Sequence, residues 1–279
     1  MFHRPSTLTE ALELKSRLKD KGVFLAGGTD LVVGVAKGRL AVEHWIDLSG
    51  VPGLSYVREE REELAIGPLA THAMLERSAF APALAQAART VGGPAIRNRG
   101  TIAGNLGTAS PAGDVSVALL ALDATLTLVR SQGSRAVPIR DFFVGPGKTR
   151  IAPDEMIQEV RIRRPADSAF LKLGKRQSVA IALVSAAAVR QSDGRVAIAL
   201  GSVAPVPLRA AQTEAHLAIA GLAPDAIREA AGLVSAEVKP IDDHRASADY
   251  RRALSGVLVR RLLEQLAAAS SNHESAAPV

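Results

Sequence analysis

The sequence "VFLAGGTDLVVG" occupies residues 23–34 and joins two apolar runs at a pair of glycines. The first run predicts a strand over Val23–Ala26, and the second predicts a short helix from about Asp30 to Lys37. Glycine permits positive φ angles and lets atoms of a ligand touch the backbone. Unpaired N–H groups at the start of a helix attract phosphate. By itself this bend is better explained as a tight turn, because it matches neither G-x-G-x-x-G nor a P-loop.

A second glycine-rich stretch, "IRNRGTIAGNLGTASPAGD", covers residues 96–114. It contains four glycines, several hydroxyl side chains, and Asn105 and Asp114 as polar groups. Long connections without secondary structure usually have a function or are disordered, and the mixture of apolar and small residues argues against disorder. Two such loops in successive lobes predict a cleft for an extended anionic ligand, such as a dinucleotide with a pyrophosphate. Two unrelated loops are the alternative.

Composition limits the class of protein and the kinds of site that this chain can form. The chain has 279 residues, 47% of them hydrophobic and 22% charged, which indicates a soluble globular protein of about two domains. It has no cysteine, which excludes disulfides, thiolate zinc sites, cysteine nucleophiles and cysteine-ligated iron–sulfur clusters in this chain. A cysteine-free chain suits a reducing cytosol, so we expect a cytoplasmic location. Neither a signal peptide nor a membrane span is expected from the apolar pattern.

Charge and histidine placement indicate no further site. The formal charge of +6 is spread along the chain, without the basic stripe and stacking aromatics of a nucleic-acid-binding protein. The histidines show no metal-ligand spacing, so each is interpreted as a surface or satisfied core residue. They are His3, His44, His72, His216, His244 and His273.

Helical and strand patterns divide the chain into units. Residues 1–55 form the expected first lobe, in which a capping box at Thr7–Glu10 opens a helix that runs to Asp20 and residues 44–48 form a strand. Residues 56–165 form the expected second lobe. Its predicted elements are a strand over 63–70, one helix over about 74–91, a loop-rich stretch over 92–114, a helix over 115–122 and a strand over 124–129.

The remaining residues predict a C-terminal α+β domain over 166–270. Two apolar runs flank Asp193-Gly194, which is a strong hairpin signal. Regularly spaced leucines and a valine between Leu254 and Leu266 mark one face of a long helix. Residues 271–279 are expected to form a disordered tail.

In order along the chain, these motifs resemble the FAD-binding (medium) subunits of molybdenum hydroxylases, the family of bacterial xanthine dehydrogenase and carbon monoxide dehydrogenase. The matching motifs are "LAGGTDL" (25–31), the second glycine loop, "PDEMIQEVRI" (153–162), "AFLKLGKR" (169–176), "GSVAPVPLRA" (201–210) and "SADYRRAL" (247–254). The resemblance implies an α+β fold. A two-lobed FAD-binding domain of the vanillyl-alcohol-oxidase (PCMH) type would precede a C-terminal domain with a three-stranded antiparallel sheet.

The resemblance also implies roles for individual residues. Residues 25–31 would wrap the pyrophosphate and approach the flavin, Asp114 would bind ribityl or ribose hydroxyls, and the backbone near Ile157 would meet the adenine half. Lys172 would lie near the isoalloxazine edge and stabilise an anionic reduced flavin. The full set expected to bind FAD is Leu25, Ala26, Gly27, Gly28, Thr29, Asp30, Leu31, Thr101, Gly104, Asn105, Ser110, Asp114, Ile157 and Lys172.

One departure from the family pattern lies in the second glycine loop. Ala103 stands where the family usually has glycine, and its methyl group would crowd a phosphate or force a small shift. No catalytic residue is expected on this chain.

The implied function is electron transfer. FAD would accept electrons from two [2Fe–2S] clusters on a small partner subunit, and a large partner subunit would carry a molybdopterin centre. FAD would then pass the electrons to NAD⁺, a quinone or O₂, within a dimer of heterotrimers. The alternatives are a stand-alone FAD oxidoreductase and a scaffold subunit without flavin.

Overall fold

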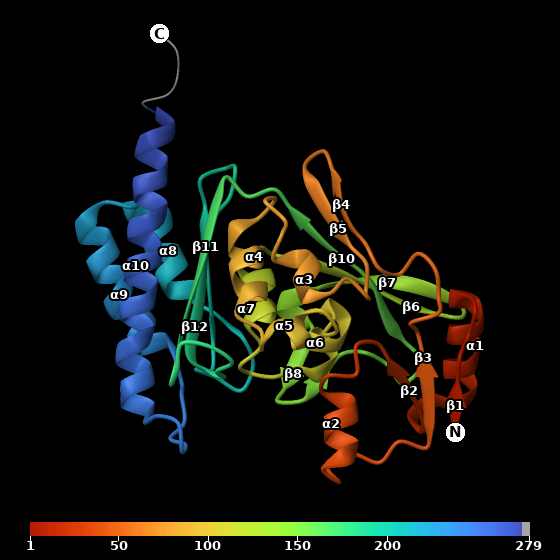
Figure 1. The fold of residues 1–279 in the computed structure, drawn as a ribbon. Coiled ribbons are helices and arrows are strands. Elements are labelled where there is room, and N and C mark those ends of the chain that lie inside the picture. Colours follow the sequence, from red (N-terminus) through yellow and green to blue (C-terminus); the bar gives the residue numbers. More distant parts are fainter. Residues whose placement is uncertain (275–279) are drawn as a thin grey trace.

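The structure is a computed structural model that describes residues 1–274, with side chains described up to residue 269. The side chain of His273 and the end of the expected tail, 275–279, therefore lie outside the described residues. The architecture is α+β, as predicted, and Figure 1 shows its units side by side along the molecule. Among the described residues, no helix combines the length and the apolar character needed to cross a membrane.

The first lobe is a small parallel sheet with its helices. Strands β1 (Phe2–His3), β2 (Gly22–Leu25) and β3 (His44–Asp47) lie in the order β1-β3-β2. Helix α1 (Leu8–Leu18) begins as predicted, because the Thr7 side chain accepts a hydrogen bond from the Glu10 amide. The α-helix ends two residues before Asp20, and the 3-10 turn η1 (Lys19–Lys21) follows. Helix α2 (Leu31–Ala36) connects β2 to the parallel strand β3.

The second lobe is an antiparallel sheet in the order β4-β5-β10-β6-β7. Its strands are β4 (Val57–Glu60), β5 (Glu63–Ile66), β6 (Thr125–Arg130), β7 (Gly133–Pro138) and β10 (Met156–Arg163). The turn η2 (Ile139–Asp141) and the short pair β8 (Phe143–Gly145) and β9 (Lys148–Thr149) complete this part. Helix α7 (Asp114–Ala121) is buried along its whole length, which explains its unbroken apolar sequence.

Two predictions for the second lobe were wrong. The single helix expected over 74–91 is two helices, α3 (His72–Leu75) and α4 (Pro82–Arg89), because Pro82 occupies the first turn of a new helix. The stretch 92–114, expected to be mostly loop, contains α5 (Pro94–Arg97) and α6 (Ile102–Thr108). Its glycines are compatible with short capped helices, which periodicity over longer windows does not detect.

The C-terminal domain has an antiparallel sheet in the order β11-β12-β13-β14. Strands β11 (Asp167–Gly174), β12 (Ala182–Arg190) and β13 (Val196–Gly201) are the three predicted strands, and β14 (Leu208–Arg209) adds two residues at the edge. Helices α8 (Ala211–Ala220), α9 (Pro224–Glu237) and α10 (Ala248–Glu274) follow. Because α10 continues to Glu274, the disordered tail expected from residue 271 is helical in its first residues.

The C-terminal sheet stands between two helical layers (Figure 1). Side chains alternate along its strands: Ala187 and Val189 join the core of the second lobe, whereas Ala186 and Ala188 join the core beneath α8–α10. Burial on both faces explains the continuous apolar run of β12. The small side chains of the alanines allow this strand to pack closely against α7 on one face and against α10 on the other.

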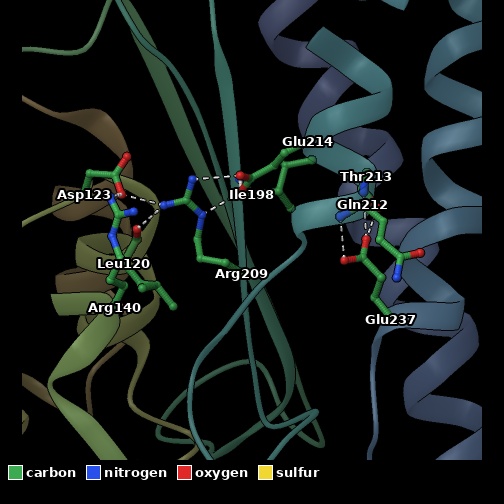
Figure 2. A network of polar contacts seen from close by, with 9 residues as sticks. All are labelled: Leu120, Asp123, Arg140, Ile198, Arg209, Gln212, Thr213, Glu214 and Glu237. Carbon is green, nitrogen blue, oxygen red and sulfur yellow. Dashed lines mark hydrogen bonds and ion pairs between the residues drawn. The ribbon is translucent and has the colours of Figure 1, made fainter. Parts of the chain in front are cut away.

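Ion pairs reinforce the contact between the domains (Figure 2). Arg209 donates to Asp123 and to the Leu120 carbonyl at the end of α7, and it also binds Glu214 on α8. Glu237 accepts hydrogen bonds from the Thr213 amide and hydroxyl near the start of α8. Arg209 thus links the C-terminal domain to the second lobe, whereas Glu237 links α9 to α8 inside the C-terminal domain.

Candidate functional site

A cleft of about 1380 Å³ lies where the two lobes and the C-terminal domain meet. All of the predicted binding residues except Leu25 line it. Those brought together are Ala26, Gly27, Gly28, Thr29, Asp30, Leu31, Thr101, Gly104, Asn105, Ser110, Asp114, Ile157 and Lys172. Leu25 belongs to β2, where it pairs with Asp47 and is not part of the cleft wall.

The first glycine loop, residues 26–31, presents free backbone amides. No acceptor in the described part of the chain receives a hydrogen bond from the amides of residues 27–31. Gly28 has φ +75°, a conformation that side chains other than glycine rarely adopt. Unpaired amides at a turn before a helix form a concave group of donors, which suits a phosphate.

Gly27 is required for a different reason from the one expected. A Cβ atom at this position would lie 2.0 Å from the carbonyl oxygen of Arg99, in the second loop. The hydroxyl of Thr108 also reaches Asp30, at 3.4 Å. The two loops are therefore in direct backbone contact, and together they form one wall of the cleft.

The amides at the start of α6, in the second glycine loop, are paired with other groups of the chain. Thr101 is the N-cap of α6 and accepts a hydrogen bond from the Gly104 amide at 3.1 Å. The amides of Ile102 and Ala103 donate to the carbonyls of Ala70 and Pro68. A Cβ atom at Gly104 would lie 3.0 Å from the Thr101 hydroxyl, so glycine permits the close cap.

Open space and side chains are what this second loop offers to a ligand. Gly107 lies on the cleft wall with no atom near the position of a Cβ. Asn105 accepts a weak hydrogen bond from Ser116, and Ser110 accepts one from the Ala112 amide. Ala103 lines the cleft at a helical position that does not need glycine, and it is partly packed on the core.

Asp114 and Lys172 form a buried ion pair in the wall of the cleft. The Lys172 ammonium lies 2.5 Å from Asp114 Oδ2 and also donates to the Thr90 carbonyl. The Thr90 hydroxyl donates to the same carboxylate oxygen. Burial raises the pKa of Asp114 above its usual range, while Lys172 and Thr90 favour the charged form. The other oxygen, Oδ1, is buried without a partner, so the site lacks one hydrogen-bond donor.

Strand β10 contributes Met156 and Ile157 to the lining of the cleft. Ile157 is buried and lies beside an irregularity in the pairing of β10 with β6, between Ile157 and Glu159. Such a bulge redirects the backbone toward a neighbouring site.

Two contributions to the cleft were missed by the sequence analysis. His72, interpreted as a surface or satisfied core residue, is buried in the cleft wall with an unpartnered Nδ1. The signal that the sequence offered for His72 was the pair Thr71-His72, in which the threonine caps α3 and the histidine begins it. The segment 239–245 of the C-terminal domain also lines the cleft. Buried Arg251 supports it by binding Asp243 and the carbonyls of Leu183 and Ser202.

Comparison with known proteins identifies the family of the chain. Residues 1–165 match the model of the FAD binding domain in molybdopterin dehydrogenase, and residues 169–266 match the CO dehydrogenase flavoprotein C-terminal domain. The chain belongs to this family of FAD-binding subunits. It is a subunit of an FAD-dependent oxidoreductase of the carbon monoxide, xanthine and nicotinate dehydrogenase type.

Individual relatives cover much of the chain. The nicotinate dehydrogenase FAD-subunit of Eubacterium barkeri is 41% identical over 70% of this chain and 70% of its own length. The carbon monoxide dehydrogenase medium chain of Afipia carboxidovorans is 31% identical over 97% of this chain and 98% of its own. A crystal structure of Cu,Mo-CO dehydrogenase superposes with a TM-score of 0.87 at 32% identity, covering 94% of this chain and 96% of that one.

Proposed function

We propose that the cleft binds FAD, with the pyrophosphate at the first glycine loop and the sugar hydroxyls near Asp114. The observation that carries this assignment is the complementarity of the two loops. One loop has unpaired amide donors, and the other ends at a buried carboxylate oxygen without a donor. A phosphate would satisfy the amides, and a ribityl or ribose hydroxyl would satisfy Asp114 Oδ1.

The remaining predicted residues would contribute to binding through their places around the ligand. Thr101, Gly104, Asn105 and Ser110 would shape the middle of the binding site, and the backbone at Ile157 would face the adenine half. Lys172 is held by Asp114 and Thr90, so its charge would stay fixed beside the flavin.

When bound, FAD supplies the ability to exchange electrons singly or in pairs. We propose that this chain receives electrons from [2Fe–2S] clusters of a small subunit, whose partner is a large molybdopterin subunit. The assembly would be a dimer of heterotrimers, and NAD⁺, a quinone or O₂ would be the final acceptor. A cytoplasmic location is part of this proposal, since a cysteine-free chain suits a reducing compartment.

Exposed apolar side chains at the cleft support the proposal that a partner subunit binds there. Ile96, Ile181 and Ile241 line the cleft and are 41%, 61% and 72% exposed. Val179 is also exposed and lies beside Gly93. A group of exposed large apolar residues is typical of a protein interface.

The test is the flavin content of the purified full chain, from its visible spectrum and from chromatography of the acid-released cofactor. We expect FAD at about one per chain, and less for Asp114→Ala, which removes the unpartnered carboxylate. Absence of flavin after reconstitution with excess FAD and with the partner subunits present would contradict the proposal and favour the scaffold alternative. Copurification with iron–sulfur and molybdenum subunits would distinguish an electron-transfer subunit from a stand-alone oxidoreductase.

A further inference from the structure

His72 lies at the point where the two glycine loops meet. It is the first residue of α3, and its backbone amide donates to the Gly100 carbonyl at 3.0 Å. A Cβ atom at Gly100 would lie 3.1 Å from His72 Cδ2 and 3.4 Å from Thr29 Oγ1. The imidazole therefore packs against Gly100 of the second loop, which also lies close to Thr29 of the first, and the ring lines the cleft that both loops border.

The ring of His72 has no hydrogen-bond partner in the described part of the chain. The residue is 2% exposed, and Nδ1 is enclosed without a donor or acceptor. Nε2 receives no partner either, although the ring forms part of the cleft wall. Buried polar groups of folded proteins are nearly always hydrogen-bonded, so an unpaired ring facing a cavity points to a partner that binds there.

The surroundings keep this ring neutral. Burial, reinforced by the positive charge of Arg97, lowers the pKa of His72 to about 4. Arg97 itself is held by Glu76, with 2.7 Å between Nε and the carboxylate. A neutral imidazole carries one N–H donor and one nitrogen acceptor, so it can bind an oxygen atom without adding charge to the site.

We infer that His72 is a further ligand-binding residue, which donates a hydrogen bond to an oxygen of the nucleotide where the two glycine loops meet. The inference rests on the proposed binding of FAD in this cleft. His72 would thereby have a hydrogen-bonding role, beyond filling the space between α3 and the second loop.

The two possible roles of His72, hydrogen-bond donor or space-filling ring, predict opposite rankings of FAD affinity for two variants. His72→Phe retains a planar ring and removes both nitrogens, whereas His72→Gln retains an N–H donor and loses the ring. If His72 donates to the ligand, the Phe variant binds FAD about tenfold more weakly and the Gln variant stays close to the wild type. If the ring only fills space, the Phe variant binds normally and the Gln variant is the weaker one.

The stability of the FAD-free chain provides a second readout. Because His72→Phe removes an unpaired buried polar group, the flavin-free variant should resist urea at least as well as the wild type, while FAD should stabilise it less. His216→Phe is a matched control, since His216 is a partly buried histidine on α8 outside the cleft. It should leave FAD binding unchanged.

The measurement is titration of the flavin-free full chain with FAD, followed by flavin fluorescence, together with urea unfolding of each variant. Should His72→Phe fail to fold, His72→Met replaces it, because its flexible apolar side chain fills irregular gaps. Wild-type affinity in the folded apolar variant would overturn the inference and leave the proposed function standing. Failure of the wild type itself to bind FAD would overturn both.

Discussion

The two glycine-rich loops have similar compositions and use glycine in different ways. In the first loop, Gly28 adopts a positive φ angle and the amides of residues 27–31 are unpaired. In the second loop, the first amides of α6 all bind groups of the chain itself. The first loop therefore offers hydrogen-bond donors to a ligand. The second loop has the first amides of α6 paired, and it borders the cleft with open space at Gly107 and with polar side chains.

This difference shows that a glycine-rich sequence does not define one kind of binding loop. Gly27 allows backbone contact between the loops, Gly104 allows a helix cap, and Gly107 leaves room in the cleft. Each glycine has a separate physical role, so substitutions should have effects of different size and sign.

The largest effect is expected from Gly27→Ala. The new methyl group would overlap the Arg99 carbonyl, so the loops would have to separate. Overpacking of this kind destabilises a protein by about 3 kcal/mol. We expect a lower urea midpoint and FAD binding weakened about 100-fold or more. A folded variant with normal FAD affinity would show that contact between the loops is unnecessary.

The second prediction concerns the support behind the second loop. Ser202 donates to the Pro111 carbonyl in this loop, and Arg251 binds both the Ser202 carbonyl and Asp243. Burial opposes ionisation of Asp243, but hydrogen bonds from Arg245, Ala246 and Arg251 outweigh it and lower its pKa to about 2. Asp243→Asn should lower the free energy of unfolding by about 2 kcal/mol at neutral pH, because hydrogen bonds to a charged group are lost.

The pH dependence of this variant has a defined sign. The native pKa of Asp243 lies below the unfolded value, so its stabilising contribution is present above about pH 4 and is lost as the pH falls toward 2. The difference between wild type and variant should shrink over this range in urea unfolding series. A constant difference would mean that the carboxylate charge does not contribute.

A smaller effect is expected from Thr101→Val. This change removes the hydroxyl that accepts from the Gly104 amide, and loss of an N-cap costs about 1 kcal/mol. Thr101→Ser retains the acceptor and serves as the control. If both variants unfold at the same urea concentration, the cap does not stabilise α6.

The smallest effect, and one of opposite sign, is expected from Gly107→Ala. Alanine is favoured over glycine inside a helix by about 0.5 to 1 kcal/mol, and no atom obstructs its methyl group. The flavin-free chain should therefore become slightly more stable, as calorimetry can show. Weaker FAD binding in the same variant would indicate that the open space at Gly107 is used by the ligand, whereas lower stability would contradict the helical argument.

Part of the fold could be predicted from local chemistry. The helix start at Thr7, the strand before Gly27 and the hairpin around Asp193-Gly194 are each determined by neighbouring residues, and the structure contains all three. Of the predicted capping box only the Thr7 half forms, because the Glu10 carboxylate accepts from Ser6 instead of the Thr7 amide. The boundary between α3 and α4 was missed because the apolar spacing continues across Pro82. The helix α6 was missed because its glycines resemble a loop.

By itself the sequence determined the class of the protein, its strand–turn–helix units and the two loops of the cleft, because these depend on residues close together in the chain. Tertiary structure alone decided that Gly27 touches Arg99, that Asp114 pairs with Lys172, and that His72 lies unpaired between the loops. The physical reason is that hydrogen bonding and burial of these groups depend on segments far apart in the chain, which meet only when the lobes and the C-terminal domain pack together.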